Sequence, residues 1–364
     1  MPQTSRRILI LEPYYGGSHR AVLDAIFPLP GWDVDLLTLP PRKWKWRMRG
    51  AAITMAAEVE RLYASGARWD LIFSSTFLNL AEFKGLTGCA IAGVPTIVYF
   101  HENQLVYPVR HEAEWDLQFP LTNITSALAA DACLFNTQWN LDAFIREIPG
   151  FLKQFPDHHP VGVAERIAAK SEVLAPPFDP TPFSAAPTRG ARSRIVWPHR
   201  WEHDKDPKAF FSAMHALAAE GLDFEVAVAG QAFRETQASV EASAAALGER
   251  LVHLGEPEGR GAYAALLGSS DIAVSTAQNE FFGLAMLEAC YAGCTPVVPD
   301  RLAYPELYPE QYRYGSPEGL VALLRSLILE RPEPGAARHL AERFTAESLQ
   351  PAYEATLARI AGHR

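Results

Sequence analysis

The alternation of short apolar runs with longer amphipathic segments is the feature that most limits what this chain can fold into. In the first half, helix-like segments such as 51–63 and 121–130 separate the apolar runs. The runs that are candidates for buried strands are residues 7–11, 32–37, 71–74, 96–100 and 132–136. Strands that alternate with helices form parallel β-α-β units, so the pattern predicts a doubly wound α/β sheet.

The pattern stops at residues 176–193, which are rich in Pro, Ala and Ser, a composition that is typical of a linker. It restarts with strand candidates at 194–197, 224–229, 251–254, 272–275 and 296–298. We therefore predict two Rossmann-like doubly wound domains, residues 1–178 and 194–345, with a linker at 179–193. A helix-like segment within 346–364 is expected to pack back toward the N-terminal domain. Ligands of such sheets bind beyond the carboxyl ends of the strands, so we expect the domains to face a central cleft.

The composition argues against several classes of protein. A formal net charge of -9 disfavours a protein that coats nucleic acid through general basicity, although it leaves room for a local basic patch. No run reaches the roughly 20 apolar residues of a membrane span, and no signal peptide is evident. We therefore expect a cytoplasmic protein without a membrane partner. The cysteines are predicted to be buried reduced thiols, because no second Cys/His pair accompanies the closest two; the four are Cys89, Cys133, Cys290 and Cys294.

Residues 280–288, EFFGLAMLE, follow a predicted strand in the second domain. Gly283 is positioned to open a helix, and a helix N-terminus beside a glycine is a natural anion site. Glu280 and Glu288 are eight residues apart, so both carboxylates are compatible with one helix face or one helix end. One carboxylate would then hold ribose hydroxyls while N–H groups hold phosphate. The alternative from spacing alone is a capping Glu280 and a solvated Glu288.

Residues 197–205, WPHRWEHDK, begin at the end of the first strand of the second domain. Arg200 and Lys205 would lie on the loop before the predicted helix 207–217. Two cations there suit a diphosphate, Arg through its fork of donors and Lys as a point charge. The alternative is a surface loop with internal Arg200–Asp204 or Lys205–Glu202 pairs.

Two polar segments follow strands of the first domain. In YYGGSH, residues 14–19, Gly16 and Gly17 would let the backbone approach a ligand closely, although a plain tight turn is an equal alternative. In HENQ, residues 101–104, the position at a strand's carboxyl end favours a site over a core role. His101 is a candidate for contact with sugar hydroxyls or for proton transfer.

Residues 42–49, RKWKWRMR, place five cations and two tryptophans within eight positions of an acidic chain. Cations interleaved with aromatic rings suit phosphates and stacked bases. The alternative is a cationic loop whose tryptophans pack onto the domain. Asp33 and Asp35 resemble a metal-binding pair, but they alternate within a predicted strand, and we predict no metal site there.

Taken together, these motifs resemble those of a known family. The Glu280-x7-Glu288 spacing, with Arg200 and Lys205, resembles the donor site of retaining GT-B glycosyltransferases of family 4. Within that group, the chain resembles the tRNA-queuosine mannosyltransferase family, in particular a bacterial member. The segments that carry this resemblance, from about residue 8 to 345, are EPYYGGSH, PRKWKWR, YFHENQLVYPV, FNTQWN, IVWPHRWEHDKDP and EFFGLAMLEA.

The resemblance implies the GT-B fold and an activity. The donor would be GDP-mannose, and mannose would pass with retention to the cyclopentenediol of queuosine at the wobble position of a tRNA for aspartate. No metal, other cofactor or obligate protein partner is implied. The alternatives are a GT-B hexosyltransferase for a lipid, glycan or small-molecule acceptor, and an inactive tRNA-binding module on a GT-B scaffold.

The resemblance also implies roles for particular residues. The catalytic candidates are His101, Glu280, Arg200 and Lys205. The donor-binding candidates are Gly16, Gly17, Arg200, Lys205, Glu280, Phe281, Phe282, Gly283, Leu284 and Glu288. The candidates for contact with the acceptor or tRNA are His19, Arg42, Lys43, Trp44, Lys45, Trp46, Arg47, Glu102, Asn103 and Gln104.

Overall fold

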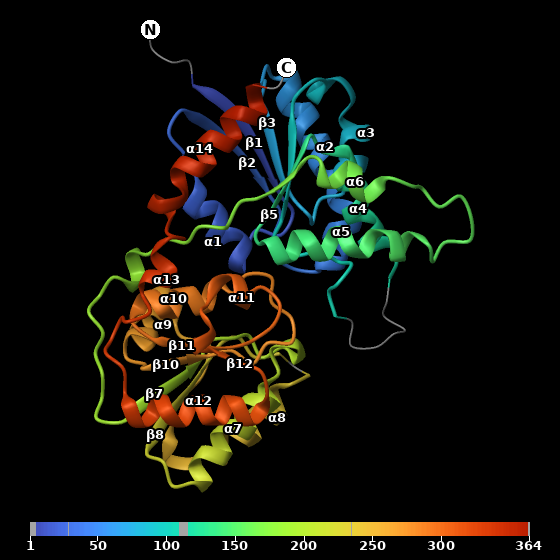
Figure 1. Ribbon diagram of the computed structural model, residues 1–364. Coiled ribbons are helices and arrows are strands. Elements are labelled where there is room, and N and C mark those ends of the chain that lie inside the picture. Colours follow the sequence, from blue (N-terminus) through green and yellow to red (C-terminus); the bar gives the residue numbers. More distant parts are fainter. Residues whose placement is uncertain (1–4, 28, 109–115, 234, 363–364) are drawn as a thin grey trace. The chain divides into compact units, whose positions relative to one another are not determined.

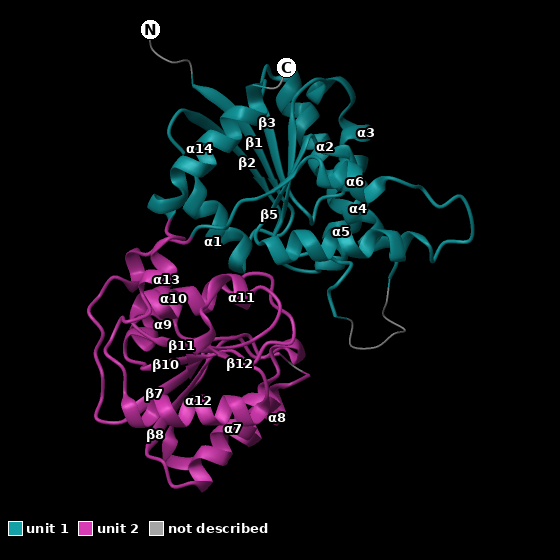
Figure 2. Cartoon of the chain, in the orientation of Figure 1, with its two compact units in different colours: residues 1–177, 346–364 teal, residues 178–345 magenta. Residues whose placement is uncertain are grey.

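A computed structural model describes residues 5–27, 29–108, 116–233 and 235–362 of the chain. The chain divides into two compact units (Figure 2). Unit 1 comprises residues 1–177 and 346–364, and unit 2 comprises residues 178–345. The last helix, α14 (Ala346–Gly362), belongs to unit 1, where the buried Tyr353 donates from its hydroxyl to the carbonyl of Ala175 at 3.0 Å.

Unit 1 is built on a six-stranded parallel sheet in the order β2-β1-β3-β4-β5-β6. The strands are β1 (Arg6–Glu12), β2 (Trp32–Thr38), β3 (Leu71–Ser75), β4 (Thr96–Phe100), β5 (Ala132–Phe135) and β6 (Ser171–Val173). The other α-helices of its described residues are α1 (Gly17–Ile26), α2 (Trp44–Ala64), α3 (Leu80–Thr87), α4 (Gln118–Ala129), α5 (Gln138–Leu152) and α6 (Val163–Ala168). Helices α1 and α14 lie on one face of the sheet and α2 to α6 on the other (Figure 1).

The sequence explains which strands are central. In β3, β4 and β5 every residue is buried, as expected of parallel strands with helices on both faces. The edge strand β2 is only partly buried, and its Asp35 carboxylate accepts from Arg7 Nε at 2.8 Å and Trp69 Nε1 at 2.6 Å. The prediction that Asp33 and Asp35 lie in a strand is confirmed. The short β6 was missed because it has only three residues, none of them buried.

Unit 2 contains a second six-stranded parallel sheet, in the order β12-β11-β10-β7-β8-β9. Its strands are β7 (Ser193–Trp197), β8 (Phe224–Ala229), β9 (Leu251–Gly255), β10 (Ile272–Val274), β11 (Thr295–Pro299) and β12 (Arg313–Tyr314). Its α-helices are α7 (Pro207–Ala219), α8 (Gln237–Ala245), α9 (Gly259–Gly268), α10 (Leu284–Ala292), α11 (Tyr304–Leu307), α12 (Pro317–Glu330) and α13 (His339–Glu342). The two-residue β12 was not predicted.

Each sheet has a point at which the strand order reverses, and ligands of open α/β sheets bind at such points. In unit 1 the reversal lies between β1 and β3, and in unit 2 it lies between β7 and β10. The loops after β1, β7 and β10 carry the glycine pair, the two cations and the EFFG segment singled out in the sequence. The sheet topology therefore positions three of the predicted motifs at ligand-binding edges.

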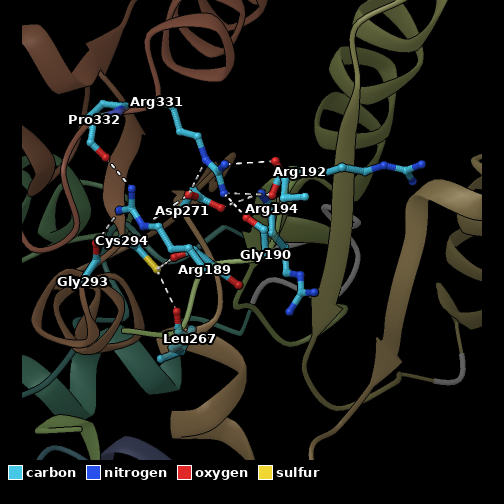
Figure 3. Close-up of polar contacts among 12 residues, drawn as sticks. Arg189, Gly190, Arg192, Arg194, Leu267, Asp271, Gly293, Cys294, Arg331 and Pro332 are labelled. Atoms are coloured by element: carbon cyan, nitrogen blue, oxygen red, sulfur yellow. Dashed lines mark hydrogen bonds and ion pairs between the residues drawn. The ribbon is translucent and has the colours of Figure 1, made fainter. Parts of the chain in front are cut away.

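The structure corrects the predicted linker, because residues 178–193 pack onto unit 2 instead of forming a free connection. Arg189 forms an ion pair with the buried Asp271 at 3.2 Å and donates to the carbonyl of Pro332 (Figure 3). Asp271 also pairs with Arg331 at 3.3 Å and accepts from the backbone N–H of Arg194 at 2.8 Å. A buried carboxylate holds this segment on unit 2, which composition alone did not reveal. Unit 2 therefore begins near residue 178 and not at 194.

Three of the four cysteines, Cys133, Cys290 and Cys294, are buried free thiols, as predicted. The prediction was wrong for Cys89, which lies on the exposed side of a short 3-10 turn, Gly88–Ile91, whose Ala90 and Ile91 are buried instead. Within the described ranges, no helix combines the length and apolarity needed to cross a bilayer.

Candidate active site

Unit 2 brings together the two cations and one of the two carboxylates predicted for the donor site. Lys205 lies in a 3-10 turn, His203–Lys205, before α7, and Glu280 follows β10. The Lys205 ammonium donates to the carbonyl of Asn279 at 2.7 Å and lies 3.4 Å from a Glu280 oxygen and 3.3 Å from an Asp204 oxygen. Since β7 and β10 are neighbours in the sheet, residues 75 positions apart meet at one edge.

The pair between Lys205 and Glu280 is charged although both groups are largely buried. Burial by itself lowers the pKa of Lys205, but the carboxylates of Glu280 and Asp204 outweigh it, and the pKa is raised. Burial by itself raises the pKa of Glu280, but Lys205, His199 and the N–H of Phe282 outweigh it, and the pKa is lowered. The loop therefore presents a fixed cation supported by carboxylates, which suits an anionic ligand.

Glu280 lies in the loop before α10, and its second oxygen accepts from the backbone N–H groups of Phe281 at 3.2 Å and Phe282 at 3.4 Å. Gly283 has a positive φ of 88° and caps the N-terminus of α10, which confirms that the helix begins there. The expectation that both glutamates share a helix face or helix end was wrong, because Glu280 precedes the helix. Phe281 and Phe282 are buried, and Leu284 is half-buried at the first position of α10.

Glu288 lies inside α10 and is buried, so it is not the solvated side chain of the alternative interpretation. Its carboxylate accepts from Arg260 Nη2 at 2.6 Å. Burial raises the pKa of Glu288, and Arg260 only partly offsets this effect. Arg260, near the start of α9, was missed because nothing in its local sequence distinguishes it from a solvated arginine.

Arg200 is half-exposed and pairs with Glu202 at 3.2 Å. The loop pairs are therefore Arg200–Glu202 and Lys205–Asp204, and neither predicted alternative pairing is found among the described ion pairs. Gly230, after β8, lies so close to this loop that a Cβ there would be 2.0 Å from the carbonyl oxygen of His199. Gly230 lies outside the predicted motifs, and its lack of a side chain leaves room for the loop at His199.

His199, next to Arg200, was not among the predicted site residues. The residue is only 5% exposed, and its Nε2 has no hydrogen-bond partner among the residues that the structure describes. Burial, followed by the positive charge of Lys205, lowers the pKa of His199 to about 3. A neutral, buried imidazole with an unpartnered nitrogen beside a fixed cation is typical of a group that contacts a ligand.

The low pKa of His199 predicts how the free energy of unfolding depends on pH. The unfolded state binds a proton near pH 6.5, whereas the folded state does so only near pH 3. The free energy of unfolding is therefore expected to fall by about 1.4 kcal/mol per pH unit as the pH drops below 6.5. Urea titrations from pH 7.5 to 5 would show this slope reduced in His199→Gln, and an unchanged slope would contradict the assignment.

Unit 1 places the glycine pair directly after β1. Gly16 is packed so tightly that a Cβ there would lie 2.4 Å from Pro41, and Gly17 has a positive φ of 53°. Both positions thus require glycine for a structural reason, and Gly16 caps the N-terminus of the ten-residue helix α1. The predicted approach of this loop to a diphosphate stays a prediction.

Next to this loop, Glu12 and His19 form a buried polar network, and the half-buried His101 lies against it. A Glu12 oxygen lies 3.1 Å from His19 Nδ1, and the other accepts from Ser75 Oγ at 3.0 Å and the Tyr14 N–H at 2.8 Å. The centroids of the His19 and His101 rings are 4.1 Å apart. Burial and the neighbouring His19 lower the pKa of His101 well below its ordinary value of 6.5, so His101 is neutral at pH 7.

The same three residues could hold a metal ion, since one ligand atom from each lies within 4.8 Å of the others. Both Glu12 oxygens, however, already accept hydrogen bonds, which indicates a hydrogen-bond network. The prediction that no metal is needed stays a prediction.

The remaining residues of the HENQ segment hold its loop in place. Asn103 is fully buried; its Nδ2 donates to Asn140 Oδ1 at 2.7 Å, and its Oδ1 accepts from the N–H groups of Leu105 and Val106. Gln104 is buried as well and donates from its side chain to Glu102 at 3.3 Å. Asn103 therefore positions the loop through its buried hydrogen bonds, and its predicted contact with the acceptor stays a prediction.

The basic segment 42–49 is not a loop throughout, because α2 begins at Trp44. Trp44 packs against Phe77 and Phe119, with ring centroids 6.4 and 5.1 Å away. Trp46, by contrast, is 60% exposed. The packing interpretation therefore applies to Trp44. The predicted contact of the exposed Trp46 with the acceptor stays a prediction.

Two Rossmann-like units, one of them with a cation pair and carboxylates at its strand reversal, define a GT-B glycosyltransferase. The chain belongs to the tRNA-queuosine alpha-mannosyltransferase family. The model of that family's N-terminal region matches residues 7–178, and the model of glycosyl transferases group 1 matches residues 185–339. The tRNA-queuosine alpha-mannosyltransferase of Drosophila melanogaster is 37% identical in an alignment of 363 residues, which covers 95% of this chain and 95% of that protein.

Solved structures support the fold. HepE from Anabaena in complex with UDP has a TM-score of 0.70 and 16% identity, over 97% of this chain and 100% of that one. Sucrose-phosphate synthase from Thermosynechococcus elongatus has a TM-score of 0.70 and 14% identity, over 98% and 99%. At these identities the similarity concerns the fold alone.

Proposed function

We propose that the chain transfers mannose, with retention, from GDP-mannose to the cyclopentenediol of queuosine at the wobble position of a tRNA for aspartate. The observation that carries this proposal is the similarity to the Drosophila mannosyltransferase over nearly the whole chain. The charged constellation of Lys205, Arg200 and Glu280 at the strand reversal of unit 2 supports a nucleotide-sugar donor. A tRNA acceptor fits a cytoplasmic location without a membrane partner.

In the proposed donor site, Arg200 and Lys205 compensate the diphosphate charge, which grows as the bond to the sugar breaks. In other enzymes a metal ion compensates this negative charge. Because Arg200 and Lys205 are proposed to do so here, we propose that the reaction needs neither a metal nor another cofactor. Glu288, oriented by Arg260, is proposed to bind the ribose hydroxyls. From unit 1, Gly16 and Gly17 are proposed to contact the diphosphate.

The proposed chemistry is attack on the same face of the sugar. The bond from C1 of mannose to the diphosphate oxygen breaks, and the acceptor hydroxyl oxygen bonds to C1. The hydroxyl proton passes to the leaving diphosphate, so that GDP departs without a covalent glycosyl-enzyme. His101, neutral at pH 7, is proposed to contact the transferred sugar. Trapping a covalent mannosyl-enzyme would contradict this route.

The proposal predicts that label from GDP-mannose enters tRNA only when the tRNA contains queuosine. The assay combines the purified chain with radiolabelled GDP-mannose and tRNA from cells with or without queuosine, and parallel reactions use UDP-glucose and UDP-galactose. We expect mannose on queuosine-containing tRNA and no label on the queuosine-free control. Transfer from another nucleotide sugar, or transfer to a lipid or glycan alone, would contradict the proposal. It would show that the chain is a hexosyltransferase with that donor or acceptor. No donor turnover, with tRNA binding intact, would indicate an inactive binding module.

A further inference from the structure

We propose that the indole of Trp46 is a stacking platform for an unpaired base of the RNA acceptor. This inference rests on the proposed function for the nature of the acceptor. Within the basic segment 42–49, Trp46 is the residue proposed to contact a base.

The indole of Trp46 lies with one face against its own helix. Trp46 lies in the first turn of α2, and Gly50 lies one helical turn further along. A Cβ added at Gly50 would lie 2.8, 2.9 and 3.0 Å from three adjacent ring atoms of Trp46, Cζ2, Cη2 and Cε2. Three nearly equal distances mean that the helix backbone approaches the face of the ring and not its edge. The glycine thus provides the space in which the indole lies against the helix.

Much of the Trp46 ring is exposed. Trp46 is 60% exposed although Gly50, under it, is buried. One face of the ring is therefore held by the helix while much of the ring is accessible. A flat aromatic surface that is fixed before binding loses little conformational entropy when a base stacks on it. Ile53, seven positions after Trp46 and 59% exposed, extends the same helix face.

The positive charge around Trp46 favours a nucleic acid as the occupant of this face. Arg42, Lys43 and Lys45 are exposed around the ring in a chain with a net charge of -9. Cations that bind phosphates beside an aromatic ring that stacks bases form the usual arrangement for single-stranded nucleic acid. Bases that are free to stack occur in loops of RNA, and an anticodon contains such bases.

The experiment measures the affinity for a queuosine-containing anticodon stem-loop RNA. In Trp46→Ala we expect the dissociation constant to rise at least ~5-fold, because a base stacked on an aromatic ring contributes that much or more. Trp46→Phe is expected to retain part of the affinity. The dependence of log K on log salt should keep its slope in Trp46→Ala and become shallower in Lys43→Ala, since only the lysine releases counterions.

A second variant separates stacking from folding. Gly50→Ala keeps Trp46 but places a methyl group where the ring lies, and alanine favours the helix, so the melting temperature should not fall. We expect its affinity for the stem-loop to decrease as in Trp46→Ala. Gly85→Ala in α3 is the matched control, because a Cβ there would meet no atom within 4 Å. Leu329→Ala, which removes another exposed apolar side chain, is the second control.

The outcomes distinguish this inference from the proposed function. If the wild-type chain glycosylates queuosine-containing tRNA but Trp46→Ala and Gly50→Ala bind the stem-loop like the wild type, the platform is overturned and the proposed function stands. If the wild-type chain neither binds nor modifies tRNA, the proposed function fails, and the platform fails with it. Equal affinity of the wild type for the stem-loop and for a fully paired duplex would also overturn the platform.

Discussion

Replacing Lys205 with Met is expected to reduce mannose transfer by about 10²- to 10³-fold, the usual effect of removing one group that stabilises charge in a transition state. The same substitution is expected to lower the free energy of unfolding by about 3–5 kcal/mol, because it leaves buried carboxylates without their cation. Those carboxylates are Glu280 at 3.4 Å and Asp204 at 3.3 Å. Initial rates with GDP-mannose and urea titrations monitor the two effects separately.

A double substitution separates the loss of charge compensation from the loss of stability. In Lys205→Met with Glu280→Gln, both members of the pair are neutral and close to their original size. Part of the lost stability should return, because Glu280 no longer carries an unpaired charge whereas the buried Asp204 still does. Transfer stays low because the diphosphate still lacks its cation. Full activity in the stable double variant would show that the ammonium does not act on the donor. Wild-type stability in Lys205→Met would show that the pair is more hydrated than its 12% and 18% side-chain exposure indicates.

The part of the donor site that could be predicted is the part that strand topology dictates. Parallel strands place their following loops at one edge, so the cations after β7 and the EFFG segment after β10 were expected to meet. Their 75-residue separation did not matter, because each motif carried its own local signal. The partners that were missed, Arg260 for Glu288 and Gly230 under His199, have no such signal. Their roles follow from packing between elements, which a single sequence does not reveal.

The basic segment illustrates a second limit. Trp44 and Trp46 are two residues apart and have the same chemistry, but on a helix they point about 200° apart. One therefore packs against Phe77 and Phe119, and the other is exposed. The sequence predicted a helix-like segment only at 51–63 and left a cationic loop as the alternative for 42–49, whereas the helix begins at Trp44. The docked segment 178–193 shows the converse, since a linker-like composition hid its contacts with Asp271.

Glu12→Gln is expected to reduce kcat for mannose transfer by about 10²-fold, the lower end of the effect of misplacing an acid–base or polar catalytic group. The Glu12 carboxylate can only accept, so it makes His19 carry its proton on Nδ1. A glutamine amide can instead donate to Nδ1, which would move the proton to Nε2 and change what His19 presents to His101. The ring centroids of the two histidines are 4.1 Å apart, so that change acts directly on the residue proposed to contact the sugar.

The matched control is Ser75→Ala, which removes a hydrogen bond to the other Glu12 oxygen and leaves His19 Nδ1 in place. Its kcat should stay within a few-fold of the wild type. The pH dependence of kcat gives an independent test of the protonation state of His101. Because burial and His19 lower the pKa of His101 well below 6.5, wild-type kcat should not change with His101 protonation between pH 6.5 and 8, and should decline only in more acidic solution. Equal kcat values for Glu12→Gln and the wild type would leave Glu12 a purely structural residue, since the tautomer of His19 would then have no effect on the reaction.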